Sequence, residues 1–183
     1  MRELIHTRET RFRGYRREDG LWDIEAELLD TKGKSVKVGG GRTIPVGDAI
    51  HDLLIRVTID SQYTVRAVET EMRAVPHTTC PSALAPMQKL LGSTMAAGWR
   101  KEIERNLGGA IGCAHLRELL AHMATVAFQT LSLELPHKGD SPPTHLGQCV
   151  SWDLAGSLVK AVYPTFAKSL SDGEIANRAS AET

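Results

Sequence analysis

The sequence predicts an α+β fold in which an antiparallel sheet from the N-terminal half is packed by three to four helices from the C-terminal half. Within the first 75 residues, stretches occur in which every second residue is apolar, and from Pro81 onward apolar residues recur at helical spacing. Strands followed by helices favour two layers over an alternating α/β sheet. At 183 residues the chain fits one domain. We expect a single domain over residues 1–170 and a disordered tail over 171–183, where the residues are small and polar.

Two stretches have the alternating pattern of half-buried strands, residues 20–30 and 50–60. Their apolar faces consist of Trp22, Ile24, Ala26 and Leu28 in the first stretch and Leu53, Ile55, Val57 and Ile59 in the second. A short polar turn at residues 60–62 predicts an antiparallel partner over residues 63–68. Residues 32–47, with three successive glycines and a proline, predict an exposed excursion with one weak strand pair.

Helical periodicity predicts four helices after the sheet. They cover residues 81–91, 98–107, 113–133 and 152–170, and the last is broken near Pro164. The third is the longest, and its apolar side predicts a central position against the sheet. The last helix is free to pack on a second copy as well as on its own core, so a homodimer is an open alternative.

Composition excludes several classes of function. Lys plus Arg and Asp plus Glu both number 22, so no summed basic charge favours nucleic acid or anionic lipid as a partner. The arginine-rich N-terminal segment is mixed with acidic residues and predicts a charged edge strand. No apolar stretch has the length of a membrane span, and three cysteines are too few for a disulfide scaffold. We expect a cytoplasmic protein whose partner is a small molecule.

The start of the third helix carries metal-ligating residue types. Cys113 and His115 open it, and Cys80 precedes another predicted helix. Should both helix starts meet at one end of the sheet, these three residues would form an open zinc or iron site. Alternatively, Cys113 is a thiolate nucleophile or a small buried residue. The polar stripe that continues from His115 through Glu118 lines a pocket or is simply solvated.

His51 has the same parity as the apolar residues of its strand, which means that it lies an even number of positions from them and on the same face. It therefore points toward the helices. A histidine there is a candidate general base, or else a hydrogen-bonded residue at the edge of the core. Asp52 has the opposite parity and is not expected to orient the ring of His51. Glu118 is a second candidate for proton transfer, and Arg17 is a candidate for holding an anionic substrate group.

Several strings in this order resemble a bacterial family known as domain of unknown function 2889. They are His6-Thr7-Arg8, residues 15–25, Ile50-His51-Asp52, residues 56–60, Cys80-Pro81, Gly98-Trp99-Arg100, residues 108–116 and Ala127-Phe128-Gln129-Thr130. The resemblance spans residues 6–131 and implies that His51, Cys80, Cys113, His115 and Glu118 belong to a shared pattern. His122 is not part of that pattern, and Ala114 stands where a Thr is typical. The family's association with bacteria that degrade aromatic and steroid compounds implies small-molecule catabolism.

These observations predict a small-molecule enzyme of bacterial catabolism. We expect a lyase or hydrolase that acts on an aromatic, phenolic or acyl-type compound by acid–base chemistry, with zinc or iron as a candidate cofactor. No nucleotide-binding motif indicates an organic cofactor. The alternative is a metal or iron–sulfur carrier without enzymatic activity.

Overall fold

The computed structural model describes residues 1–135 and 141–168. The chain falls into two compact units, Met1–Pro136 and His137–Thr183, and each is described by itself. The single domain over residues 1–170 stays a prediction, and the expected tail over 171–183 lies outside the described residues.

The first unit contains six strands and two α-helices in its described part. The strands are β1 (His6–Arg16), β2 (Trp22–Lys32), β3 (Val36–Lys37), β4 (Thr43–Ile44), β5 (Ala49–Ile59) and β6 (Val65–Ala74). The helices are α1 (Trp99–Leu107) and α2 (Ala114–Glu134), with 3₁₀ segments at Gly39–Gly41, Cys80–Ala83, Ala85–Leu90 and Gly109–Ile111. The α+β expectation is confirmed, and so are the weak pair β3–β4 and the long helix at 113–133.

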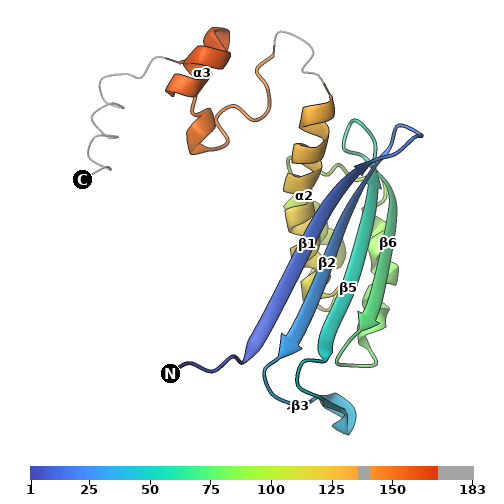
Figure 1. Ribbon diagram of the computed structural model, residues 1–183. Helices are drawn as coiled ribbons and strands as arrows, with labels where there is room; N and C mark the ends of the chain where they lie inside the picture. Colours follow the sequence, from blue (N-terminus) through green and yellow to red (C-terminus); the bar gives the residue numbers. More distant parts are fainter. Residues whose placement is uncertain (136–140, 169–183) are drawn as a thin grey trace. The chain divides into compact units, whose positions relative to one another are not determined.

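The main sheet has four antiparallel strands in the order β1-β2-β5-β6. Its inner face carries the predicted apolar rows of β2 and β5, all of them buried. Helix α2 packs across this face against β1, β2 and β5, and α1 packs on α2. Figure 1 shows both helices on the same side of the sheet. The core therefore lies between one sheet face and one helical layer.

Two contacts fix how the helices approach each other and the sheet. The indole nitrogen of Trp99 in α1 donates a buried hydrogen bond of 2.7 Å to the backbone oxygen of Leu120 in α2. Gly14 lets β1 approach α2 closely, because a Cβ there would lie 1.9 Å from Oγ1 of Thr130. Helix α2 is thus held against α1 near Leu120 and against β1 near Thr130.

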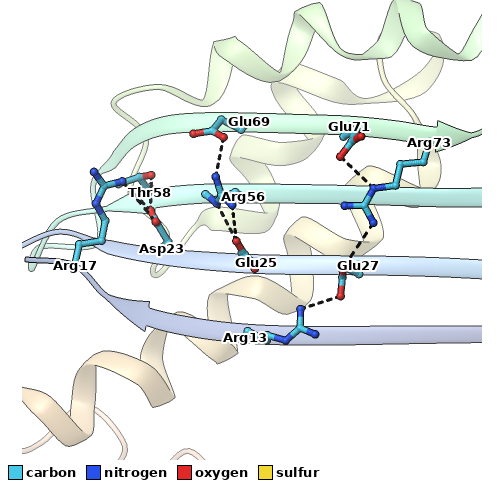
Figure 2. A network of polar contacts seen from close by, with 10 residues as sticks. All are labelled: Arg13, Arg17, Asp23, Glu25, Glu27, Arg56, Thr58, Glu69, Glu71 and Arg73. Carbon is cyan, nitrogen blue, oxygen red and sulfur yellow. Dashed lines mark hydrogen bonds and ion pairs between the residues drawn. The ribbon is translucent and has the colours of Figure 1, made fainter.

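The opposite face of the sheet is covered by ion pairs (Figure 2). Arg56 bonds Glu25 on one side and Glu69 on the other, at 2.9 Å each. Arg13 of β1 contacts Glu27 of β2 at 2.9 Å, and Arg73 of β6 reaches the same Glu27 across β5 at 3.7 Å. The long arginine stems lie over the sheet and the charges are paired. This face needs no covering layer.

Two predicted helices differ from the structure. Residues 81–91 form two 3₁₀ segments instead of one helix, each with a proline in its first turn. The second proline, Pro86, has no N–H with which to continue an earlier helix. Residues 152–170 do not form one helix: the second unit has α3 (Ser157–Val162) between 3₁₀ segments at Val150–Trp152 and Pro164–Phe166. Pro164 again follows the helix end. Within the described ranges, no helix combines the length and apolarity needed to cross a lipid bilayer.

Candidate functional site

Three polar residues form one row across the inner face, at the end of the sheet where β5 begins. Arg8 of β1 stands opposite Asp30 of β2, and Asp30 stands opposite His51 of β5. The register shifts directly after Asp30, which ends the regular pairing of β2 with β5 at this point. Because paired residues share a face, all three side chains point to the side covered by α2. The apolar rows of the sheet thus end in a polar row.

Asp30 is the centre of this row, and its side chain is only 2% exposed. Arg8 donates from Nε to Oδ1 at 2.8 Å and from Nη2 to Oδ2 at 2.9 Å, a fork that matches both carboxylate oxygens. His51 Nδ1 lies 2.9 Å from Oδ2. Burial alone would raise the pKa of Asp30, but the hydrogen bonds from Arg8 and His51 outweigh it and lower the pKa. The carboxylate is therefore charged at neutral pH.

His115, in the first turn of α2, completes the site from the helical side. Its ring lies 4.0 Å from the ring of His51, measured between centroids, and its Nε2 lies 3.9 Å from Oδ2 of Asp30. Burial lowers the pKa of His51 despite the hydrogen bond to Asp30. Burial also lowers the pKa of His115, and the charges of His51 and Arg8 lower it further. Both imidazoles are therefore mainly neutral at pH 7.

Three further side chains border this group. Cys113 Sγ lies 3.7 Å from Nδ1 of His115. Glu118, one turn along α2, accepts a 2.8 Å hydrogen bond from Nη1 of Arg8. His6, two residues before Arg8 on the same face of β1, places Nε2 3.3 Å from Oδ1 of Asp30. The result is a mixed cluster of imidazoles, carboxylates, a thiol and one guanidinium.

The structure brings together four of the six residues predicted from sequence. His51 and His115 are in contact, Cys113 is beside His115, and Glu118 reaches the row through Arg8. Asp52 lies near Arg73 on the open face, as its parity predicts. The polar stripe of α2 meets the site only at its start; beyond Glu118 its members His122, Thr125 and Gln129 are exposed.

Arg17 and Cys80 lie outside the cluster. Arg17 follows the far end of β1 and is held by Asp19 at 2.8 Å. It also contacts Asp23 at 3.3 Å (Figure 2). Cys80 begins the 3₁₀ segment after β6 and is partly exposed. Among the residues that the structure describes, the one group of three or more suitable ligand atoms belongs to Asp30, His51 and His115, all within 4.8 Å of one another. Cys80 and Cys113 are not members of it.

Sequence reasoning missed Asp30 and Arg8 as site residues. Asp30 has the same parity as the buried residues of β2, so the alternating pattern itself places a carboxylate on the core face. Arg8 is one of several arginines in the N-terminal segment, and only the register of β1 distinguishes it from the others.

Comparison with protein families gives one finding. Residues 6–129 match the family described as "Protein of unknown function (DUF2889)". The match contains every member of the cluster, from His6 to Glu118. No curated protein and no solved structure matches the chain.

Proposed function

Since the chain belongs to the DUF2889 family, whose description assigns no activity, we propose its function from the site itself. We propose a small-molecule enzyme that works by acid–base chemistry, a lyase or hydrolase of bacterial catabolism. The observation that carries the proposal is the contact between His51 Nδ1 and the buried carboxylate of Asp30 at 2.9 Å. An imidazole held in this way has one fixed tautomer and a defined ring orientation.

His51 is the general base of the proposed reaction. An Nδ1 this close to a carboxylate carries the ring proton and donates a hydrogen bond to Asp30. Nε2 is then the nitrogen that accepts a proton from the substrate, and Asp30 stabilises the imidazolium that forms. Because the pKa of His51 is lowered by burial, the base is in its neutral, proton-accepting form at pH 7.

His115 is the second proton-transfer group. Its ring lies against that of His51 but comes from a different element, and in the proposed reaction one substrate contacts both rings. Eliminations and hydrolyses each need one group to take a proton and another to supply one. Arg8 and Glu118 act as positioning residues: Arg8 is bound to Asp30 and Glu118 at 2.8 Å each, and so holds the row against α2.

The substrate class is proposed from the expected catabolic role and from the surroundings of the cluster. The cluster lies where the apolar rows of β2 and β5 end, which supports a substrate with an apolar body and one reacting polar group. We propose an aromatic, phenolic or acyl-type compound as the substrate. Arg17 is not part of the proposed site, because it lies at the far end of β1 and is bound by Asp19 and Asp23.

The test is a turnover assay on phenolic esters, acyl thioesters and hydroxylated aromatic acids. His51→Ala should lower kcat/KM by about 10² to 10⁴, the usual contribution of a general base. Asp30→Asn should lower kcat at unchanged KM, because it affects the base and not substrate binding. His122→Ala is the matched control, an exposed histidine of α2 outside the cluster. Full activity of His51→Ala, or turnover of none of these compound classes, would contradict the proposal.

A further inference from the structure

We infer that Asp30, His51 and His115 form a binding site for one divalent transition metal ion. These residues differ from the Cys80, Cys113 and His115 set that the sequence suggested. Each ligand comes from a separate element, β2, β5 and α2, and their ligand atoms lie within 4.8 Å of one another. Two imidazoles and one carboxylate are ligand types that zinc and iron accept in proteins.

The distances within the group fit shared coordination. Zinc binds nitrogen and oxygen at about 2.0 to 2.2 Å, so two ligand atoms on one ion lie at most about 4.4 Å apart. The two separations from Oδ2 of Asp30 are 2.9 Å to His51 Nδ1 and 3.9 Å to His115 Nε2. The longer one exceeds a hydrogen bond. His115 therefore converges on the carboxylate without bonding it directly, as a ligand on the far side of an ion would.

The charges around the group leave room for a cation. Arg8 carries one positive charge beside Asp30, but Glu118 accepts a hydrogen bond from the same guanidinium at 2.8 Å. The positive charge of Arg8 and the negative charge of Glu118 offset each other, so the negative charge of Asp30 remains to attract the ion. A carboxylate offers about four acceptor positions, and Arg8 uses one on each oxygen. The second position on Oδ2 is the one that His51 contacts without metal, and the ion would take it. Arg8 then orients the ligating carboxylate, as the hydrogen-bonding partners of metal ligands commonly do.

Three protein ligands define the type of centre. Structural zinc sites are closed by four protein ligands, whereas catalytic sites hold three and leave a position for water or substrate. An ion at Asp30, His51 and His115 would lower the pKa of its bound water toward about 7. The catalytic role of the ion rests on the proposed function: with the ion bound, His51 has released its Nδ1 proton to solvent and is a ligand, and the bound water supplies the base. The binding of the ion does not depend on that function.

The experiment uses the full chain, purified without a histidine tag and treated with a chelator. Zn²⁺ is added alone and followed by calorimetry, and Co²⁺ is added separately and followed by its visible absorption. We expect one ion per chain, and a Kd at least about 100-fold weaker in His115→Ala. His115 is partly exposed on the helix surface, so this variant should fold; Asp30→Asn is the second test of the same set. Circular dichroism checks that each variant is folded.

Matched controls separate this site from the one suggested by sequence. Cys80→Ser and His122→Ala should bind Zn²⁺ as the parent does, because neither residue belongs to the group or contacts it. Zn²⁺ binding that is lost in Cys80→Ser and kept in His115→Ala would overturn the inference. So would a chain that takes up no Zn²⁺ or Co²⁺.

The two proposals fail in different ways. Without metal binding, turnover that depends on His51 would still support acid–base catalysis by the imidazoles. Stoichiometric Zn²⁺ binding that His115→Ala abolishes supports the metal site even if no turnover is found. In that case the chain would be the non-enzymatic metal carrier that the sequence offered as the alternative.

Discussion

Replacing Arg8 by Met should destabilise the protein, because it leaves the carboxylate of Asp30 buried without its main partner. Met keeps a long apolar stem and removes the guanidinium. The side chain of Asp30 is 2% exposed and that of Arg8 is 32% exposed. Breaking a fully buried ion pair costs about 3 to 5 kcal/mol. Solvent screens part of this pair through Arg8, so we expect a loss of about 2 to 3 kcal/mol at pH 7.

An independent bound follows from protonation. A carboxylate that is buried without a partner can take up a proton instead of staying charged. For a group with an ordinary pKa of about 3.9, protonation at pH 7 costs about 4 kcal/mol of free energy. The expected loss stays below this bound because His51 still bonds Asp30. At pH 5 the bound falls to about 1.5 kcal/mol. The difference between parent and Arg8→Met should therefore shrink as the pH falls.

The sign agrees with the titration of the parent. The folded pKa of Asp30 is lowered, chiefly because the bonds from Arg8 and His51 outweigh burial. Its stabilising contribution is therefore full above the unfolded pKa of about 3.9 and is lost as the pH falls through the folded value. In Arg8→Met, burial dominates and raises the pKa of Asp30, so acid relieves the variant while it weakens the parent.

Urea unfolding followed by tryptophan fluorescence measures this difference at pH 7 and pH 5, with a chelator present. Arg13→Met is the matched control on the same strand: its pair with Glu27 is 38% and 29% exposed, so we expect a loss below about 1 kcal/mol. Asp30→Asn should destabilise the parent but stabilise Arg8→Met, where it removes an unpaired charge. A loss below about 0.5 kcal/mol in Arg8→Met, or an equal loss at both pH values, would refute the reasoning.

Three further predictions concern the fold around the site. Gly14→Ala places a Cβ 1.9 Å from Oγ1 of Thr130 and should cost about 1 to 3 kcal/mol in urea unfolding; Thr130→Ala should recover part of that loss, and no recovery would count against the contact. Burial alone would raise the pKa of Asp60, but hydrogen bonds from its own turn and an arginine lower it. Its stabilising effect should thus be lost below about pH 4, and Asp60→Asn should flatten this part of the stability curve; an unchanged acid slope would argue against it. Arg56→Gln loses the ion pair with Glu25 on the open face, which should lower the free energy of unfolding by about 1 kcal/mol. Because salt screens charges, urea unfolding in 0.5 M salt should show a smaller difference between parent and variant. A difference that does not change with salt would contradict an ionic origin.

The sheet and its faces could be predicted because alternation is a local signal. Each residue of β2 and β5 takes its face from its neighbours in sequence, so the inward direction of His51 followed from parity. The long helix was equally readable from its apolar side. The extent of the helix predicted at 152–170 was wrong, because proline and glycine interrupt a periodicity that an apolar count alone does not detect.

The partners of His51 required long-range information. Parity excluded Asp52, but the residue that bonds the ring is 21 positions away on the neighbouring strand. Only the register of β2 against β5 brings Asp30 beside it. Cys80 shows the reverse case. Its position before a proline resembles a helix start, but the path of the chain after β6 decides where that start lies, and no local pattern encodes that path.

One signal in the sequence does connect these residues. Two strands that are apolar on one face each contain an ionisable exception near one end, Asp30 in β2 and His51 in β5. In an antiparallel pair the end of one strand meets the beginning of the other, so two such exceptions face each other across the ladder. A buried charge and a buried imidazole are each costly alone, and they are tolerated together because they bond. Functional sites are commonly the positions at which a sequence departs from the pattern that favours folding. For this reason we assign the proposed function to the Asp30 and His51 end of the sheet, and not to the ion pairs on the open face.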